Sequence, residues 1–459
     1  MRPEIQKLMK ILWLCNMMLP VIAQQFNMEA SNKEGWLSGL ADVLLTHQAQ
    51  NGIELSIAFP MPGGTMGAGN ALVERELMIN GTKLKCYGFP EDTLNAHNYD
   101  SALEDIMDRI IKSADPDMVH CFGTEYPHTL AMCRQFPDKS RILITIQGLC
   151  SVYANVFEAD LPDDVIVDVT FRDFLKKDSI PEQKAKYIAR GENEIEALKL
   201  AGNIGGRTAW DKHYAHEYNP DAKYFVMRET LRTDFYEGQW KKEACEKHSI
   251  FLSQGDYPIK GLHYMLLAMP AILKEFPDAH VYVAGNSVVS HTTLKDRIKT
   301  PAYGKYLRSL MKRYALEDKL TVLGKLDSAA MKDRYLKSDL FVCCSAIENS
   351  PNSLGEAMLL GMPCVTAGVG GIPSIFDADK DGVMYAGTVY REDGSDSDAG
   401  DGALETVAKN LSEAVIKIWS DEKKESEYCR NAREHALRNH DRQANYEQTI
   451  NVYKQITGE

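Results

Sequence analysis

The chain has 459 residues, of which 44% are hydrophobic and 25% are charged, and its formal net charge is −13. This length exceeds that of one ordinary domain and predicts two or three, each with its own core. The acidic surface argues against unspecific nucleic-acid binding, which depends on clustered Lys and Arg, and weakly against adhesion of a whole face to anionic lipid.

The cysteines give the first indication of the compartment. Ten are spread along the chain and none form a Cys-x-x-Cys pair, which argues against zinc or thioredoxin-like chemistry. Several lie in apolar runs such as 341–344, as buried free thiols do. We therefore expect a reducing, cytoplasmic setting, with peripheral contact at the inner membrane face as an option.

Residues 10–15 form the first apolar run, and two interpretations stay open for it. Lys7 and Lys10 precede the run and Val21-Ile-Ala23 resembles a signal-peptidase site, so the segment could be a signal peptide. Asn16 and Pro20 interrupt the apolar stretch, however, and a buried first strand is the favoured interpretation.

Short apolar runs alternate with amphipathic stretches, the pattern of parallel α/β folds. In the first half, strands are predicted at 10–15, 54–59, 84–88, 117–122, 141–146 and 201–206, and helices at 36–50 and 100–113. In the second half, strands are predicted at 249–253, 279–284, 319–323, 339–344, 363–366 and 383–385, and helices at 261–275, 302–315, 328–337 and 352–360. Residues after 403 are expected to be helical.

The restart of this pattern predicts an α/β protein of two Rossmann-like, doubly wound lobes facing a cleft. Residues 1–235 would form the first lobe and 236–440 the second, with a linker within 220–247. Residues 441–459 would form a helix that packs back on the first lobe. Doubly wound sheets bind ligands beyond the carboxyl ends of their strands, so two lobes can hold two substrates.

The segment 341–375 carries the most specific chemistry. Ser350-Pro351 is typical of a helix start, with Ser as N-cap and Pro as first helical residue. The free N–H groups of the following turn, at Asn352, Ser353, Leu354 and Gly355, predict a diphosphate site.

Two acids accompany this turn. Glu348 precedes the helix and Glu356 lies within it, and together they could hold two hydroxyl groups of one sugar or ribose. The alternative is an ordinary loop carboxylate and an acid that favours a helix start.

Two further turns add candidate ligand contacts. Lys260-Gly261 follows a strand and opens a helix, which suits a phosphate, although an exposed helix-start lysine is the alternative. Lys325 lies in a strand-to-loop turn, 322–326, which is either a nucleobase contact or an ordinary turn.

Together these residues resemble the retaining glycosyltransferases of family 4, also called group 1. The shared pattern is Glu348, Glu356-Ala-Met, Gly361-Met-Pro-Cys-Val365 and Gly370-Gly371. The resemblance implies a GT-B fold and a nucleoside diphosphate sugar as donor, with no metal and no further cofactor. It implies that Glu348 holds the transferred sugar, Glu356 the donor ribose, Lys260 and Gly261 the diphosphate, and the 322–326 turn the base.

One position departs from the family. Its usual basic partner before the Lys-Gly pair is replaced here by the neutral Gln254, which puts part of the diphosphate clamp in doubt. Arg207 is the candidate that would compensate.

The first half resembles the polysaccharide-building branch of the same family. The matching stretches are Gly35-Trp36, His120-Cys-Phe-Gly-Thr-Glu125, Gln147-Gly148 and Gly206-Arg-Thr-Ala-Trp-Asp211. This implies sugar contact for His120 at the end of a strand, for which a core or surface histidine is the alternative. Gly35, Trp36, Glu125 and Gln147 would contact a saccharide or lipid-linked acceptor.

Two other motifs receive simpler interpretations. Residues 377–382 imitate the start of a calcium-binding EF-hand loop but lack its closing Glu, so no metal is expected there. Residues 172–190 mix Lys with Phe and Leu and are read as a solvated helix or loop, with membrane contact as the alternative.

The predicted function is transfer of a hexose, with retention, from a nucleoside diphosphate sugar to an acceptor hydroxyl in polysaccharide synthesis. A nucleotide-sugar epimerase, which uses the same lobes without an acceptor, is the first alternative. A periplasmic sugar-binding protein is the second, and ten cysteines without evident pairing count against it.

Overall fold

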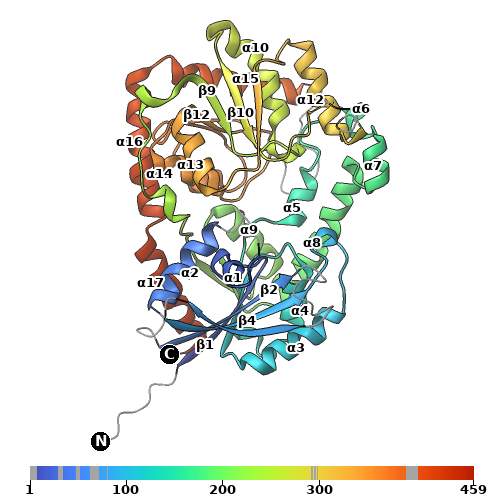
Figure 1. Cartoon of the computed structure of the whole chain (residues 1–459), viewed down its shortest axis with the longest axis vertical. Coiled ribbons are helices and arrows are strands. Elements are labelled where there is room, and N and C mark those ends of the chain that lie inside the picture. The colour runs from blue at the N-terminus through green and yellow to red at the C-terminus, as the bar shows by residue number, and fades with distance from the viewer. Residues whose placement is uncertain are drawn as a thin grey trace, which may run out of the picture. The chain divides into compact units, whose positions relative to one another are not determined.

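The computed structural model describes residues 8–458, except 29–34, 48–51, 62–71, 80, 291–292, 294–295, 297 and 389–401. The chain divides into two compact units. Unit 1 contains Met1–Val152, Tyr187–Arg232 and His440–Glu459, and unit 2 contains Tyr153–Lys186 and Thr233–Asn439. Each unit holds one sheet with helices packed on it (Figure 1).

Unit 1 is built on an eight-stranded sheet in the order β3-β4-β2-β1-β5-β6-β7-β8. The strands are β1 (Met9–Cys15), β2 (Ile53–Met61), β3 (Val73–Ile79), β4 (Thr82–Pro90), β5 (Met118–Phe122), β6 (Ile142–Thr145), β7 (Asn203–Gly206) and β8 (Lys223–Val226). All pairs are parallel except β3 with β4. Leaving β3 aside, the order is that of a doubly wound sheet, and it reverses between β1 and β5.

Strand β1 lies in the centre of this sheet because both of its faces are apolar. Ile11 and Trp13 pack into the core on one side, and Leu12 and Leu14 pack into the core on the other. This alternation is what a strand buried on both faces requires. The prediction of a buried first strand at 10–15 is therefore confirmed.

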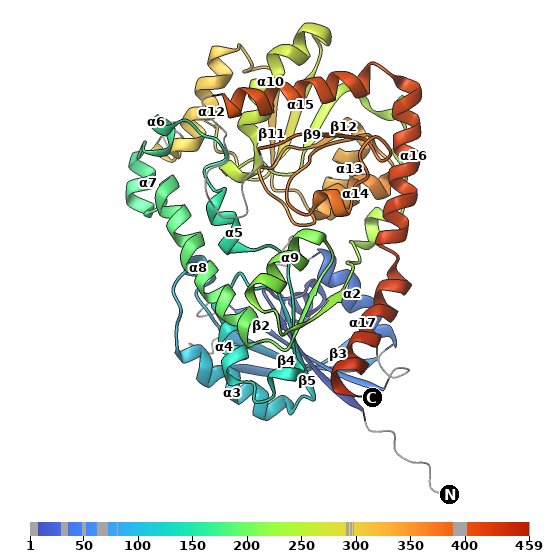
Figure 2. The ribbon, with the colours of Figure 1, turned by 180° about the vertical axis from the view of Figure 1, so that it is seen from behind.

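The helices that follow the strands of unit 1 cover its sheet. They are α1 (Pro20–Gln25), α2 (Gly35–His47), α3 (Ala102–Ala114), α4 (Pro127–Gln135), α9 (Ala209–Tyr218) and α17 (Arg442–Thr457), and α5 (Cys150–Asn155) and α8 (Ile180–Leu200) each contain a unit boundary. Helix α17 packs on α2, as Figures 1 and 2 both show. The predicted helix at 36–50 matches α2, while 48–50 lie outside the described residues.

Unit 2 is built on a six-stranded parallel sheet in the order β11-β10-β9-β12-β13-β14. The strands are β9 (Glu246–Leu252), β10 (His280–Ala284), β11 (Leu320–Gly324), β12 (Ser338–Cys343), β13 (Cys364–Ala367) and β14 (Val383–Tyr385). The order again reverses once, between β9 and β12, which marks the ligand-binding end of a doubly wound sheet.

The last two helices of unit 2 each pack against another helix of the same unit. The helices of this unit are α6 (Asp163–Ile166), α7 (Phe171–Lys176), α10 (Leu262–Glu275), α12 (Ala302–Arg313), α13 (Ser328–Lys337), α14 (Asn352–Leu360), α15 (Ala403–Trp419) and α16 (Glu422–Asn439). Helix α15 packs on α10, and α16 packs on α14 (Figure 2). The predicted α/β class with two doubly wound lobes and a helical C-terminal segment is confirmed.

The structure corrects the chain segments assigned to the lobes. Residues 153–186 group with unit 2, although 1–235 was predicted to form a single lobe. The reason is packing: the buried Asp173 accepts a hydrogen bond from Ala302 N at 2.8 Å, and Lys305 pairs with Asp168 at 2.7 Å. The predicted linker 220–247 also contains β8 and the start of β9. No helix in the described ranges is long and apolar enough to span a membrane.

Candidate active site

The two strands beside the reversal point of the unit 2 sheet each deliver one charged residue. Strand β9 ends at Leu252 and leads through a short 3-10 turn, Pro258–Lys260, into α10. Strand β12 ends at Cys343, and its loop carries Glu348 before α14 begins. Because β9 and β12 are neighbours, Lys260 and Glu348 meet.

Lys260 and Glu348 form a close ion pair. Lys260 Nζ lies 2.5 Å from Glu348 Oε1, and Ser345 Oγ donates to the same oxygen at 2.7 Å. Burial opposes the charged form of Lys260, yet the carboxylate of Glu348 holds the pKa of this lysine well above its usual value. The site therefore contains a charged ammonium group, which is one of the groups that bind phosphate in proteins.

Main-chain contacts hold the two loops together. Ala346 N donates to Ile259 O at 2.7 Å and joins the two loops, while Gly371 N, from the loop after β13, donates to Glu348 O at 2.9 Å. Gly261 has a φ of 73°, and a side chain there would run into the carbonyl oxygen of Cys344. The Lys-Gly pair is therefore fixed by close backbone approach, and a residue with a Cβ does not fit at the second position.

The start of α14 offers the predicted cluster of amide groups. Pro351, with a ψ of 116°, is the N-cap and forms no side-chain cap, so the helix begins at Asn352. The prediction that Ser350 is the N-cap is therefore wrong by one residue, because Pro351 itself is extended. Tyr335 Oη donates to Ser353 O at 2.9 Å and fixes this first turn.

Two polar side chains at or near the start of α14 are at least partly buried. Among the described residues, Asn352 Oδ1 is a buried oxygen without a hydrogen-bond partner. Glu356 follows one helical turn later and is buried, 4% exposed. Leu354 and Gly355 are also buried, so this helix start presents backbone rather than bulky side chains.

The remaining unit 2 candidates lie on neighbouring loops. Gln254 Nε2 donates to Asp256 Oδ1 at 2.9 Å, and Asn286 Nδ2 donates to the other oxygen of Asp256 at 2.9 Å. The loop where the family has a basic residue thus contains a neutral amide bound to an acid. Lys325 is exposed directly after β11.

Unit 1 has a polar pair at its own reversal point. Asn16 follows β1 and Glu125 follows β5, and Asn16 Nδ2 donates to Glu125 Oε2 at 2.8 Å. Arg190 Nε donates to the main-chain oxygen of Glu125 at 2.8 Å. Glu125 was predicted as a site residue from the sequence, whereas Asn16 was not, although its position directly after the first strand was the available signal.

A second polar cluster in unit 1 joins three residues from successive strand ends. Arg207 Nη2 lies 3.0 Å from Glu229 Oε1, and the same nitrogen donates to Gln147 Oε1 at 3.3 Å. Arg207 and Glu229 are both buried. Arg207 was predicted to contact the donor and Gln147 the acceptor, whereas the two side chains lie next to each other. Glu229 was not predicted, because β8, which precedes it, lies in the segment that was expected to be a linker.

His120 is not where the sequence analysis expected it. It lies inside β5 and is 1% exposed, with Nδ1 2.7 Å from Tyr453 Oη and Nε2 3.1 Å from Thr145 Oγ1. Burial lowers its pKa to about 3, so the ring is neutral. The expected sugar contact is corrected: both nitrogens are occupied by protein, so His120 is a core residue that links the sheet to α17.

Two sets of residues remain. Gly35 and Trp36 open α2, and the side chain of Trp36 lies outside the described part. Asp377, Asp381 and His435 place ligand atoms within 4.8 Å of one another, but His435 Nδ1 contacts Asp381 at 2.5 Å and its Nε2 lies 3.0 Å from Asn439. Because both ring nitrogens are occupied, this group ties α16 to the 377–381 loop.

The fold and this site define a class: a GT-B-type protein with a phosphate-binding candidate in its second doubly wound unit. Residues 235–393 match the family model of glycosyl transferases group 1. The putative colanic acid biosynthesis glycosyltransferase WcaL of Escherichia coli is 25% identical over 205 residues, which are 40% of this chain and 50% of WcaL. The chain therefore spans about half the length of this relative.

Solved structures agree on the fold across the whole chain. Sucrose-phosphate synthase from Thermosynechococcus elongatus superposes with a TM-score of 0.66 at 14% identity, covering 98% of this chain and 99% of that one. HepE from Anabaena, solved with UDP and glucose, gives a TM-score of 0.60 at 13% identity, covering 97% and 100%.

Proposed function

We propose that this chain is a glycosyltransferase that moves a hexose from a nucleoside diphosphate sugar to an acceptor hydroxyl, with retention at the anomeric carbon. The observation that carries the proposal is the Lys260–Glu348 pair at the reversal point of the unit 2 sheet, beside the start of α14. The match of 235–393 to glycosyl transferases group 1 supports it. The same match favours neither an epimerase nor a periplasmic sugar-binding protein.

In this proposal unit 2 holds the donor. The diphosphate lies against the N–H groups at Asn352 and Ser353 and against the ammonium of Lys260. Its oxygens replace Glu348 as partner of Lys260, and Glu348 is then available for hydroxyl groups of the transferred sugar. Glu356 accepts from the ribose, and the turn at 324–326 contacts the base through its backbone.

The reaction exchanges one bond for another at the anomeric carbon. The acceptor oxygen forms the new glycosidic bond as the bond to the diphosphate oxygen breaks, and the nucleoside diphosphate leaves with the electron pair. Lys260 and the α14 amides stabilise the charge that develops on the leaving oxygen. The acceptor proton passes to that phosphate as the two oxygens exchange on one face of the sugar.

Unit 1 supplies the acceptor site in this scheme, at the carboxyl ends of its strands. Glu125 and Gln147, which follow β5 and β6, would contact the acceptor, together with Asn16 and Glu229. Their carboxylate and amide groups suit hydroxyls of a saccharide or lipid-linked saccharide. The colanic acid assignment of WcaL supports polysaccharide synthesis as the setting.

The test is a thermal-shift panel of UDP-, GDP- and ADP-sugars, followed by transfer assays with the class that binds. One class should raise the melting temperature, and Glu356→Ala should abolish that shift. Glu275→Ala, an exposed acid at the end of α10, is the control and should leave it intact. Stabilisation by a free sugar with no response to any nucleotide sugar would replace the proposal with a sugar-binding protein.

A further inference from the structure

A strip of apolar side chains faces solvent along α6 and α7. We call residues Asp163–Lys177 the α6–α7 strip. Its exposed members are Val167 (70%), Val169 (53%), Phe171 (63%), Phe174 (71%) and Leu175 (62%). Isolated exposed apolar residues are normal, but five within nine positions form a patch of the kind that marks an interaction surface.

The apolar face of α7 stays exposed because contacts of the opposite face hold this helix in place. Phe171, Phe174 and Leu175 have the i, i+3, i+4 spacing that shares one helix face. Thr170 and Asp173 form a capping box at the start of α7. The buried Asp173 also accepts from Ala302 N at 2.8 Å, which holds α7 against α12.

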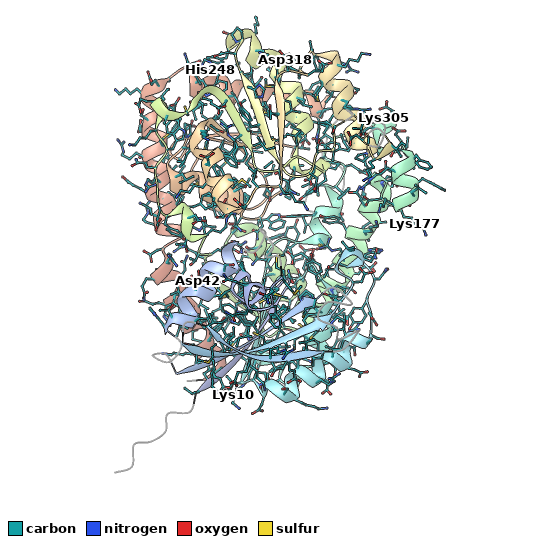
Figure 3. The ribbon with its side chains drawn as sticks, in the orientation of Figure 1. Lys10, Asp42, Lys177, His248, Lys305 and Asp318 are labelled. Atoms are coloured by element: carbon teal, nitrogen blue, oxygen red, sulfur yellow. The ribbon has the colours of Figure 1, made fainter. Side chains whose placement is uncertain are left out.

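The two ends of the strip carry opposite charges. Asp163 and Asp164 are exposed at its first end, and Lys176 and Lys177 are exposed at its last end. The side chain of Lys177 points away from the ribbon in Figure 3. Two such strips laid antiparallel would set the acids of each against the lysines of the other, with the aromatic rings between them.

We propose that a second copy of this chain docks on the α6–α7 strip, the two strips running antiparallel about a two-fold axis. A two-fold interface uses the same patch on both subunits, so the patch must be complementary to itself. The charge order of this strip meets that condition. Phe171 and Phe174 are the aromatic anchors that such interfaces favour at their centres.

The same charges disfavour an anionic membrane as the occupant. The exposed charges of the strip balance, with Asp163 and Asp164 against Lys176 and Lys177, while Asp168 pairs with Lys305 and Asp173 is buried. Arg172 is moreover paired with Asp173 at 3.0 Å and with Asp178 at 2.7 Å. Anionic lipid would meet two exposed aspartates at one end of the strip, whereas a second copy would offer them lysines.

The first experiment measures the mass of the full chain across a concentration series by sedimentation or light scattering. The wild type should show a concentration-dependent dimer, and Phe174→Asp should weaken it about tenfold or more. Leu94→Asp is the matched control, because Leu94 is 92% exposed but lies in unit 1. A dimer weakened equally by both changes would overturn the proposal.

The second experiment exchanges the charges. Asp163→Lys with Asp164→Lys in one variant, and Lys176→Glu with Lys177→Glu in another, should each lose the dimer. Mixing the two variants should restore it, because each strip then meets its complement. A wild type that stays monomeric overturns the proposal. If that monomer sediments with anionic vesicles in a Phe174-dependent way, a lipid surface takes the place of the second copy.

Discussion

Lys260 and Glu348 lie 88 positions apart in the chain, yet their side chains meet at 2.5 Å. Each neutralises the charge that the other would offer a ligand. In the proposed reaction, donor binding exchanges this internal pair for two external ones, phosphate with lysine and sugar with carboxylate. The two residues should therefore respond differently to substitution.

Glu348→Gln should separate binding from transfer. The amide no longer pairs with the ammonium of Lys260, so affinity for the nucleoside diphosphate should stay the same or rise. Loss of the carboxylate at the sugar should lower kcat by about a hundredfold, as removal of a charged transition-state contact does. Calorimetry with the diphosphate and initial rates with the donor check both parts, with Glu275→Gln as control. A fall in diphosphate affinity without loss of kcat would contradict the assigned role.

Lys260→Ala should show the opposite pattern. Affinity for the nucleoside diphosphate should fall by about tenfold or more, because a charge-assisted contact is lost. The melting temperature should also fall, because Glu348 stays in place without its cation. Lys274→Ala, at the exposed end of the following helix α10, is the control for both measurements. Unchanged diphosphate affinity would remove Lys260 from the proposed clamp.

His120→Phe should destabilise unit 1 and leave the donor KM unchanged. The variant keeps an aromatic ring but removes the bonds to Tyr453 and Thr145, at a cost of about 1–3 kcal/mol. The wild-type pKa is lowered to about 3 from 6.5, so the contribution of His120 to stability is full above pH 6.5 and declines as pH falls toward about 3. Melting curves across pH test this, with His216→Phe on the exposed side of α9 as control. A raised KM with an unchanged melting temperature would instead support a sugar contact.

Glu194→Gln should change the pH dependence in the other direction. Glu194 accepts from Ser151 N at 3.0 Å, Ser151 Oγ at 2.6 Å, Cys150 N at 3.0 Å and Thr124 Oγ1 at 2.6 Å. Burial nevertheless raises its pKa from 4.5 to about 7. The folded protein thus holds this proton more tightly than the unfolded chain does, so stability should decline as pH rises from about 4.5 to about 7.

The amide introduced by Glu194→Gln would point an N–H at donors, so this variant should be less stable by about 1–3 kcal/mol at acidic pH. Its stability should also lose the decline between about pH 4.5 and about pH 7. Denaturant melts at several pH values measure both effects. Glu192→Gln, two positions earlier and exposed, should reproduce neither. If the stability of Glu194→Gln still declines over this pH range, the titration of another group causes the decline.

Gly261→Ala should damage the donor site more than Gly324→Ala does. Both glycines have positive φ, 73° and 77°, so each substitution costs about 1–2 kcal/mol of backbone strain. Only at Gly261 does the added Cβ run into a carbonyl oxygen, that of Cys344, while the space around Gly324 is open. Overpacking adds about 1–3 kcal/mol. Gly261→Ala should therefore lower the melting temperature and the diphosphate affinity more than Gly324→Ala does. Equal effects of the two substitutions would exclude a close approach of Gly261 to the Cys344 carbonyl.

The strands of both sheets could be predicted because they are buried on two faces and read as continuous apolar runs. Two strands were missed for the opposite reason. Strand β3 lies at an edge and exposes Glu74, Arg75 and Glu76, and β8 is a partly exposed four-residue strand at the other edge. These two segments form strands because they pair with β4 and β7, respectively, and their own composition does not indicate a strand.

In the candidate site, the role of a residue could be predicted from the sequence where a local motif surrounds it. It could not be predicted where the role depends on a partner distant in the sequence. Lys260 and Glu348 each follow a strand and carry a recognisable neighbour, Gly261 in one case and the α14 start in the other. Glu229 carries no such local signal and is identified only by its contact with Arg207. His120 was misplaced because its partner, Tyr453, lies 333 positions later in the chain.

That long-range partner has a consequence for how the protein is made. Trp13 Nε1 donates to Tyr453 Oη at 2.8 Å, so the central strand of unit 1, near the start of the chain, is completed by its last helix. Unit 2 is translated between the two. While the ribosome is still adding residues 233–439, the apolar surface along β1 stays uncovered by α17. Nascent unit 1 should therefore be a target for chaperones, and premature termination before α17 should leave an aggregation-prone product even though unit 2 has been fully synthesised.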